Sequence, residues 1–152
     1  MSTDAILFEQ QGGIATITLN TPDKGNAIDL VFVRRLFEIA MQCDLDPSIR
    51  CVVLTGNGRL FCAGGDIAFL RNSALNDNGE SGRKFFHDEY QLNHLLFTYP
   101  KPVIAFMDGI VMGGGVGISQ PARYRVATEN TRFAMPETGI GLFPDVGGGW
   151  YL

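Results

Sequence analysis

The feature that most constrains this chain is a type of segment that occurs three times. Each copy starts with a short apolar run, passes through a tight turn and an extended piece, and ends in a glycine cluster or a Pro-Glu loop. The copies read CVVLTGNGRLFCAGGD, VIAFMDGIVMGGG and YRVATENTRFAMPETGIG. Units of this kind cannot bury their own apolar faces, so they are expected to stack on one another. The repetition predicts an α/β coil of strand–strand–helix turns, with the glycine junctions on one side.

Local patterns predict the individual elements. Gly12-Gly13 is a hairpin signal, and Asp29 is a candidate N-cap for the helix that follows it. Strands are predicted over 5–11, 14–19, 51–55, 103–107 and 124–128, and helices over 30–43 and 83–97.

Two further expectations concern burial and irregular structure. The apolar runs 51–55 and 103–107 are typical of strands that are buried on both faces. The second helix is expected to be amphipathic, with Phe86, Tyr90, Asn93/His94 and Phe97 on one face. The polar segment 72–82 is expected to be a surface loop.

Composition argues against several classes of function. The 152 residues have the length of one domain, and the net charge of −4 with a pI near 5.0 offers no basic surface for nucleic acid. No apolar run approaches the ~18–20 residues of a membrane helix. Because Cys43, Cys51 and Cys62 lack CxxC spacing, and His87 and His94 lack a ligand pattern, neither disulfides nor a bound metal is expected. A reducing, cytoplasmic compartment fits best.

Two carboxylates stand out in the stretch FAMPETGIGLFPDVGGG, residues 133–149. Its prolines and glycines argue against a regular helix, so Glu137 and Asp145 are expected on two short loops. Apolar neighbours suggest that these loops are partly buried, and burial raises the pKa of a carboxylate; the neighbours are Phe133, Met135, Ile140, Leu142 and Phe143. Such carboxylates serve acid–base catalysis near neutral pH, but they can equally be turn residues that cap backbone amides. The stretch by itself leaves both interpretations open.

Two glycine-flanked stretches, Ala63-Gly64-Gly65 and Gly113-Gly114-Gly115, could each aim a backbone N–H at one carbonyl oxygen. Paired amide donors of this kind form an oxyanion hole. The same glycines could simply permit tight strand–helix junctions, and glycine alone does not decide between the two. Other glycine-rich sites are excluded, because no stretch has the dinucleotide-binding spacing, GGGVGIS lacks a phosphate-loop lysine, and GISQP is not a nucleophile elbow.

The segments FCAGGD, MGGGVG and MPETGIGLFPDVGGG together resemble the crotonase (enoyl-CoA hydratase/isomerase) superfamily, and the resemblance covers nearly the whole chain. From Phe85 onward the sequence is most similar to 3-hydroxyisobutyryl-CoA hydrolases, whereas its first part looks like a general hydratase/isomerase. The resemblance implies a spiral of ββα turns that binds an acyl-coenzyme A and stabilises a thioester oxyanion. No cofactor is implied, because coenzyme A is part of the substrate.

The resemblance also implies roles for individual residues. The N–H groups of Ala63 and Gly114 would form the oxyanion hole, and Glu137 matches a catalytic glutamate of the hydratases. Asp145 falls where the hydrolases have an aspartate. The second hydratase glutamate falls on Gly117, so water addition by a pair of glutamates is not expected.

Further positions match substrate contacts. Glu89 matches a hydrolase residue that helps to hold the substrate, although on its own it would be interpreted as a solvated helix charge. Lys24 and Gly25 match positions near the adenine and ribose of coenzyme A. Gly65 and Asp66, in the FCAGGD segment, complete the implied substrate-binding set.

Members of the superfamily are normally longer than this sequence, which stops at Leu152. Residues 1–152 are therefore expected to be a single N-terminal core, a fragment without the helices that usually cover the acyl pocket. By resemblance the protein is expected to be a homo-oligomer, a trimer or hexamer, and the isolated chain is expected to self-associate or to be poorly soluble. The expected activity is hydrolysis of a short branched 3-hydroxyacyl-CoA. The alternatives are a hydratase or isomerase of the same fold and a non-catalytic acyl-CoA-binding or assembly fragment.

Overall fold

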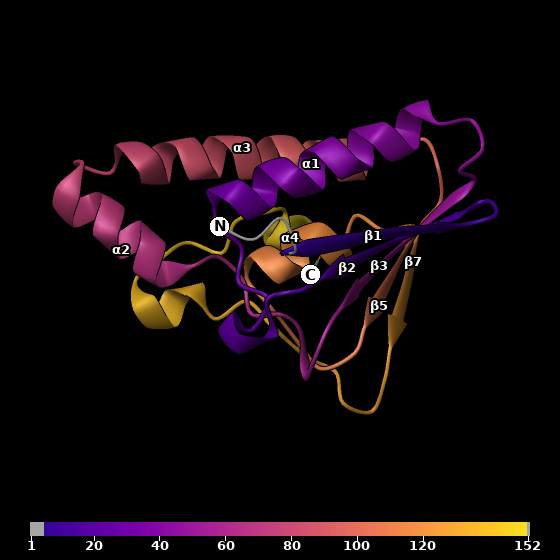
Figure 1. Ribbon diagram of the computed structural model, residues 1–152. Coiled ribbons are helices and arrows are strands. Elements are labelled where there is room, and N and C mark those ends of the chain that lie inside the picture. The colour runs from indigo at the N-terminus through magenta and orange to yellow at the C-terminus, as the bar shows by residue number, and fades with distance from the viewer. Residues whose placement is uncertain (1–4, 152) are drawn as a thin grey trace.

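The three repeated segments stack on one another and, together with the strands that precede them, form two sheets (Figure 1). The structure is a computed structural model that describes residues 5–151, so residues 1–4 and 152 of the predicted 1–152 core lie outside the described part. The strands are β1 (Ile6–Gln11), β2 (Ile14–Leu19), β3 (Cys51–Gly56), β4 (Leu60–Cys62), β5 (Val103–Met107), β6 (Ile110–Met112), β7 (Tyr124–Ala127) and β8 (Arg132–Ala134). Each repeat contributes one strand to the larger sheet and its next strand to the smaller sheet.

Pairing between neighbouring strands follows the order of the repeats. The larger sheet has the order β1-β2-β3-β5-β7, and the smaller sheet has the order β4-β6-β8. β1 and β2 form the predicted antiparallel hairpin, and the other neighbours are parallel. Val52 pairs with Val103 and Ile104 with Tyr124, while Ile110 pairs with both β4 and β8. Because β4, β6 and β8 are parallel, the loops that follow them leave the same edge of the smaller sheet.

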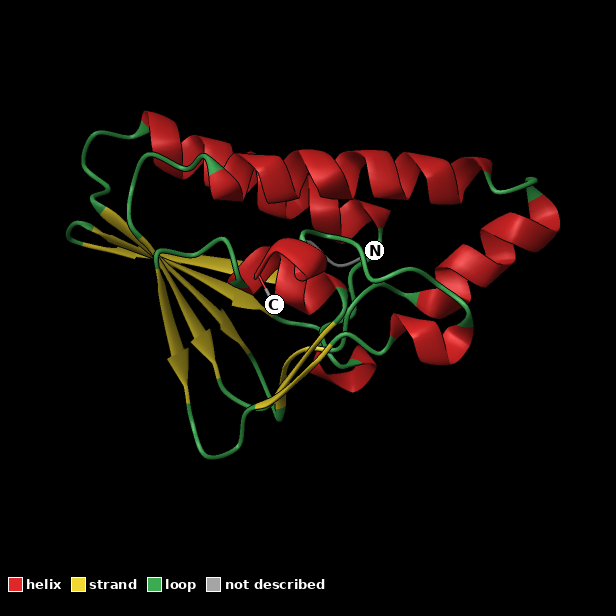
Figure 2. Cartoon of the chain, turned by 180° about the vertical axis from the view of Figure 1, so that it is seen from behind, coloured by secondary structure: helices red, strands yellow, loops and turns green. Residues whose placement is uncertain are grey.

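The long helices lie over one side of the larger sheet. The helices are α1 (Leu30–Leu45), α2 (Ile67–Asn76), α3 (Glu80–Phe97), α4 (Gly114–Ser119) and α5 (Gly148–Tyr151), and the 3-10 turns are η1 (Pro22–Lys24) and η2 (Glu137–Ile140). α1 and α3 run side by side, and α2 leads into one end of α3 (Figure 1). Figure 2 shows the smaller sheet from behind, beside the larger one. The core lies between these layers and includes Leu36 of α1, Leu54 of β3 and Phe85 of α3.

The predicted ββα spiral is confirmed, and most element bounds are close to prediction. The five predicted strands differ from the observed ones by at most one residue at either end. The Asp29 carboxylate accepts a 2.8 Å hydrogen bond from the Phe32 N–H, so it caps α1 as predicted. α1 continues beyond position 43 and ends at Leu45.

The prediction that 72–82 is a surface loop is wrong, because α2 and α3 occupy most of it. The Asp66 carboxylate caps α2 by accepting a 3.0 Å hydrogen bond from the Phe69 N–H. The buried hydroxyl of Ser73 accepts a 2.8 Å hydrogen bond from the Gly82 N–H and so joins α2 to α3. The polar side chains of this segment form hydrogen bonds at and between the two helices. The polarity of the segment was therefore a poor indicator of a loop.

Two predictions about burial are also wrong. α3 buries the face with Phe85, Glu89, Leu92 and Leu96, not the face that carries Phe97. β3 and β5 bury alternate residues instead of both faces. Helices cover one face of the larger sheet, so a continuous apolar run still leaves every second side chain less buried. No helix within residues 5–151 has the length and apolar character that crossing a bilayer requires.

Candidate active site

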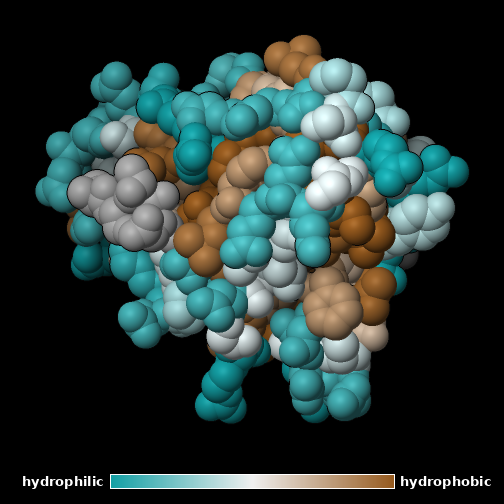
Figure 3. Space-filling model, turned by 45° about the vertical axis from the view of Figure 1, so that its right-hand side comes forward, coloured by the Kyte–Doolittle hydropathy of each residue, from teal (hydrophilic) through white to brown (hydrophobic). Residues whose placement is uncertain are grey.

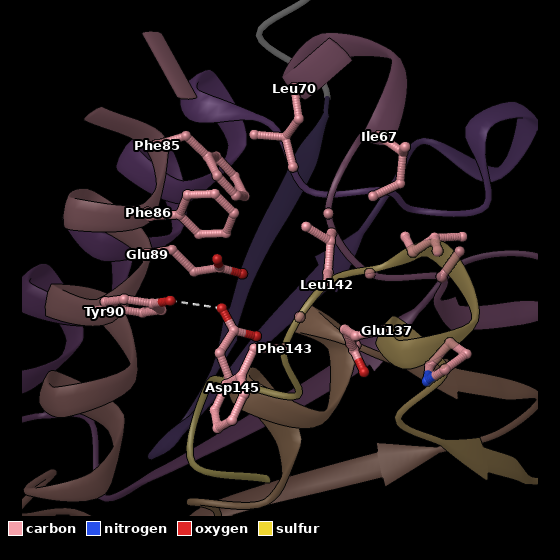
Figure 4. A pocket seen from close by; sticks show the side chains of 17 residues that line it. Ile67, Leu70, Phe85, Phe86, Glu89, Tyr90, Glu137, Leu142, Phe143 and Asp145 are labelled. Atoms are coloured by element: carbon pink, nitrogen blue, oxygen red, sulfur yellow. Dashed lines mark hydrogen bonds between the residues drawn. The ribbon is translucent and has the colours of Figure 1, made fainter. Parts of the chain in front are cut away.

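A cavity of about 290 Å³ lies where the loops after β4, β6 and β8 meet α3 (Figure 4). Three carboxylates line it, from Glu89, Glu137 and Asp145. Glycines of the loops and apolar side chains form the rest of the wall, among them Ile67, Leu70, Phe85, Phe86, Leu142 and Phe143. The structure therefore brings the two predicted loop carboxylates and the helix glutamate into one cavity.

Glu89 is the most buried of the three, with 2% of its surface exposed. A Cβ added at Gly114 would lie 2.6 Å from Oε1 of Glu89, so the carboxyl group lies against the backbone of that glycine. Within residues 5–151 its side chain makes no hydrogen bond or ion pair. Burial, and then the carboxylates of Asp145 and Glu137, raise the pKa of Glu89 to about 8. The group is therefore mostly protonated at neutral pH, which corrects its interpretation as a solvated helix charge.

Glu137 is the first residue of η2 and lies against the glycines that follow β6. A Cβ added at Gly113 would come 2.8 Å from Oε1 of Glu137. The other oxygen, Oε2, is buried and has no hydrogen-bond partner among the described residues. A buried carboxylate oxygen without a partner is costly unless water or a ligand binds it. Glu137 therefore has an acceptor available for a molecule in the cavity.

Asp145 lies on the loop before α5 and is tied to α3. Its Oδ2 accepts a 2.6 Å hydrogen bond from the Tyr90 hydroxyl (Figure 4). Burial, and then this hydrogen bond, raise the pKa of Tyr90, so the phenol remains a donor at neutral pH. The next residue, Val146, has a φ of 44°, a left-handed conformation that is strained for a β-branched side chain. Strain of this kind persists only where the surrounding structure enforces it.

Of the two backbone N–H groups predicted to form an oxyanion hole, one is not available to a ligand. The N–H of Ala63 donates a 2.9 Å hydrogen bond to the carbonyl of Gly25. That donor is already used inside the protein, so the prediction that Ala63 contributes to an oxyanion hole is wrong. Among the backbone hydrogen bonds of residues 5–151, none uses the N–H of Gly65 or Gly114. A Cβ added at Gly114 would lie 3.5 Å from the Gly65 nitrogen, so the two free amides are neighbours.

Of the other predicted substrate contacts, Gly65 lies in the cavity wall, whereas Lys24, Gly25 and Asp66 lie outside it. Lys24 is exposed at the end of η1, and Gly25 contacts Ala63. Their roles near the adenine and ribose of coenzyme A stay predictions. The carboxylate of Asp66 is used as the N-cap of α2.

Gly117 of α4 has no room for a side chain. A Cβ there would lie 2.6 Å from Cβ of Val146 and 2.9 Å from Nδ2 of Asn93. The loop that carries Asp145 therefore packs directly on the α4 backbone. A glutamate at position 117 would have to displace that loop.

Some apolar residues of the loop are less buried than predicted. Phe133 and Met135 pack against the core, but Ile140, Leu142 and Phe143 are 59%, 42% and 82% exposed. The last three line the cavity. They form an apolar wall for the hydrocarbon part of a ligand.

Sequence reasoning missed Tyr90 as a site residue, because its hydrogen-bond partner is 55 positions away in the chain. The only signal was its place next to Glu89 in the segment HDEY. Cys62 lies next to the site but is fully buried, and burial raises the pKa of its thiol to about 12. It is therefore an unreactive thiol. His87 and His94 are exposed, in agreement with their interpretation as surface residues.

Comparisons with known proteins point to one family. The family model described as enoyl-CoA hydratase/isomerase matches residues 14–152. The 3-hydroxyisobutyryl-CoA hydrolase 1 of Arabidopsis thaliana is 44% identical over 151 residues, and the mitochondrial 3-hydroxyisobutyryl-CoA hydrolase of Danio rerio is 48% identical over 148 residues. These alignments cover 99% and 97% of this chain but 40% and 38% of the relatives. The chain thus spans about 40% of the length of the curated relatives it matches.

Two solved structures are similar to the fold described above. A carnitinyl-CoA dehydratase from Mycobacterium thermoresistibile gives a TM-score of 0.93 at 44% identity, covering 97% of this chain and 44% of that chain. An enoyl-CoA hydratase from Rhodobacter sphaeroides 2.4.1 gives a TM-score of 0.90 at 38% identity, covering 94% and 43%.

Proposed function

Because the chain belongs to the enoyl-CoA hydratase/isomerase family, we propose that it hydrolyses the thioester of a short, branched 3-hydroxyacyl-CoA. The observation that carries the proposal is one cavity whose wall holds three carboxylates and the two free backbone amides of Gly65 and Gly114. The relatives named 3-hydroxyisobutyryl-CoA hydrolases, which align with nearly the whole chain, support this reaction class.

The thioester oxygen binds to the N–H groups of Gly65 and Gly114. Both donors are free and adjacent, which supports their use as a pair. They would stabilise the negative charge that develops on the oxygen when a nucleophile adds to the carbonyl carbon. Loss of one such donor typically lowers the rate by ~10²–10³.

Glu137 supplies the attack on the carbonyl carbon. Its unpartnered Oε2 and its contact with Gly113 support this role. It either removes a proton from an attacking water or attacks the carbon itself, and the C–S bond then breaks. Both routes consume one water and yield a carboxylic acid and a free thiol.

Asp145 binds the 3-hydroxyl group of the acyl chain. Tyr90 occupies Oδ2, which leaves the other oxygen of the carboxylate for the substrate. The apolar wall that includes Leu142 and Phe143 suits a short branched hydrocarbon. The rest of coenzyme A passes Ala63 towards Lys24 on the surface.

Release of free thiol tests the proposal. The protein is given 3-hydroxyisobutyryl-CoA and, separately, an enoyl-CoA. We expect thiol release from the first substrate, and little loss of conjugated absorbance from the second. Asp145→Gly should depress thiol release, whereas Asp88→Asn, outside the cavity, should not. Rapid loss of absorbance without thiol release would overturn the hydrolase proposal.

Hydration of an enoyl-CoA is the second candidate, because the two similar solved structures are those of a carnitinyl-CoA dehydratase and an enoyl-CoA hydratase. Addition of water across a double bond needs one group that activates water and another that delivers a proton to carbon. Position 117, where the resemblance expects the second glutamate, is a glycine packed on Val146. This packing favours hydrolysis. Binding of acyl-CoA without either reaction would favour a non-catalytic module.

We also propose that the protein forms homo-oligomers and needs no cofactor beyond the coenzyme A of its substrate. Figure 3 shows hydrophobic areas among the hydrophilic side chains of one face. Exposed apolar residues occur on the strands of the larger sheet, namely Leu7, Ile14, Phe106, Tyr124 and Val126. Such surfaces support self-association. Sedimentation equilibrium tests this, and a trimer or hexamer is the expected result.

The cytoplasmic compartment stays a proposal that rests on three free cysteines. The Danio rerio relative carries the word mitochondrial in its name, so fractionation of cells that produce the protein is the deciding measurement.

A further inference from the structure

Glu89 takes no part in the steps above, although it is the most buried carboxyl group of the cavity. We propose, on the basis of the proposed hydrolysis, that Glu89 donates the proton that the departing coenzyme A thiolate requires. This assigns a catalytic role to a residue that was expected only to hold the substrate.

The position of Glu89 suits this role. Its Oε1 lies against the backbone of Gly114, one of the two free amides, and Gly65 adjoins the same point. A thioester whose oxygen binds these amides has its carbonyl carbon, and the sulfur one bond away, next to the Glu89 carboxyl group. No hydrogen bond within residues 5–151 uses that carboxyl group, so its proton is available to a ligand.

The surroundings keep the carboxyl group neutral. The titratable groups that face it are the carboxylates of Asp145 and Glu137, the phenol of Tyr90 and the thiol of Cys62. Within the described residues no cation faces it. Arg34 of α1 contacts α3, but it pairs with Asp88 at 2.8 Å instead. Burial together with two carboxylates favours the protonated acid.

A neutral acid at this point completes the reaction. When the C–S bond breaks, its electron pair goes to sulfur, and the proton of Glu89 moves to the same atom to give the thiol. The proton released by the attacking water then returns to Glu89. Its raised pKa of about 8 is close to the ~8.5 of a cysteine thiol, so proton transfer from Glu89 to a thiolate of similar basicity costs little free energy.

Changing the leaving group tests this role. Wild-type protein and Glu89→Gln are given two thioesters of the same 3-hydroxyacyl group, one of coenzyme A and one of 4-nitrothiophenol. The aryl thiolate is a far weaker base and departs without a proton. We expect Glu89→Gln to lower kcat/KM for the coenzyme A thioester by ~10²-fold or more, and for the aryl thioester by less than ~10-fold. Asp88→Asn, the matched change one residue earlier on α3, should leave both values unchanged.

The possible results distinguish failure of the proton-donor role of Glu89 from failure of the proposed hydrolysis. An equal loss for both thioesters would mean that Glu89 only binds substrate, and the proton-donor role would be overturned while hydrolysis stands. No thiol release by the wild-type protein from either compound would overturn the hydrolysis and this role with it.

A measurement on the wild-type protein does not depend on how the variant folds. Between pH 6 and pH 10, kcat/KM for the coenzyme A thioester, which reports the ligand-free protein, should fall above about pH 8, because Glu89 then loses its proton. The aryl thioester should not show this fall. A matching fall for both compounds would overturn the role of Glu89.

Discussion

The hydroxyl of Tyr90 on α3 donates a 2.6 Å hydrogen bond to Oδ2 of Asp145, 55 positions later in the chain. This contact joins the helix to the loop between η2 and α5 across the cavity (Figure 4). The hydrogen bond fixes the position of the Asp145 carboxylate. The next residue, Val146, has a left-handed conformation, which persists only where surrounding contacts such as this one enforce it.

Tyr90→Phe should therefore lower kcat/KM for the 3-hydroxyacyl-CoA by about 10-fold, because a hydrogen bond to a charged group is lost. Thiol release measures this effect. Tyr99→Phe is the matched control, since the Tyr99 hydroxyl donates to the Ala40 carbonyl outside the cavity. An equal loss of activity in both variants would show that Tyr90 acts only through general stability.

Glu137→Gln should lower kcat by at least ~10²-fold, because an amide can neither accept a proton from water nor attack the thioester. Cys62→Ser and His94→Gln should keep most of the activity per folded protein. The Cys62 thiol stays protonated because burial raises its pKa to about 12, and His94 is exposed. A severe loss in Cys62→Ser with an intact fold would instead indicate a thiol nucleophile.

Gly117→Ala should destabilise the protein by about 1–3 kcal/mol, which is the usual cost of overpacking. The added Cβ would lie 2.6 Å from that of Val146, so the loop with Asp145 must shift and thiol release should fall as well. Urea unfolding measures the stability. Gly149→Ala is the control, since a Cβ there has nothing within 4 Å. Equal stability of the two variants would contradict the close packing at position 117.

Glu89→Gln should change how stability depends on pH. Folding raises the pKa of this carboxyl group from 4.5 to about 8, so its contribution to stability is complete below pH 4.5 and is lost as the pH rises to 8. At about 1.4 kcal/mol per pKa unit, the loss is on the order of 4–5 kcal/mol. The variant should thus be more stable than the wild type at pH 9, by an amount that shrinks towards pH 5.

Urea unfolding at several pH values tests this expectation. Asp88→Asn leaves Glu89 in place and should keep the wild-type slope between pH 5 and pH 9. A Glu89→Gln protein that is less stable than the wild type by the same amount at every pH would contradict the buried, protonated state of Glu89.

Asn26→Ala should destabilise the protein by about 3 kcal/mol, because several buried groups lose their partner at once. The buried Asn26 amide nitrogen donates to the carbonyls of Asn57, Leu60 and Phe61, at 3.0, 2.8 and 3.2 Å. Asn26 also has a φ of 53°, which alanine tolerates less well. Thermal unfolding measures the loss. Asn57→Ala, whose side chain is exposed, is the control, and an equal loss there would contradict the role given to Asn26.

The sequence by itself determined the repeated architecture. Apolar periodicity and turn residues predicted the β1–β2 hairpin, the repeated strands and the helix that starts after Asp29, because these patterns depend on neighbours within a few residues. Glu137 and Asp145 were found in the same way, from their place in a stretch rich in glycine and proline. The roles of these two carboxylates in catalysis stay predictions.

Only the tertiary structure decided which groups of the site are available. The Ala63 amide is occupied by Gly25, a residue 38 positions earlier, and this leaves the Gly65 and Gly114 amides as the free pair. Likewise, the local sequence around Glu89 suggested a solvent-exposed helix charge. The packing of α3 instead points its side chain towards the cavity, and burial there raises its pKa. Burial and hydrogen-bond partners depend on segments that are distant in sequence, and for that physical reason local patterns could name the residues but not their state.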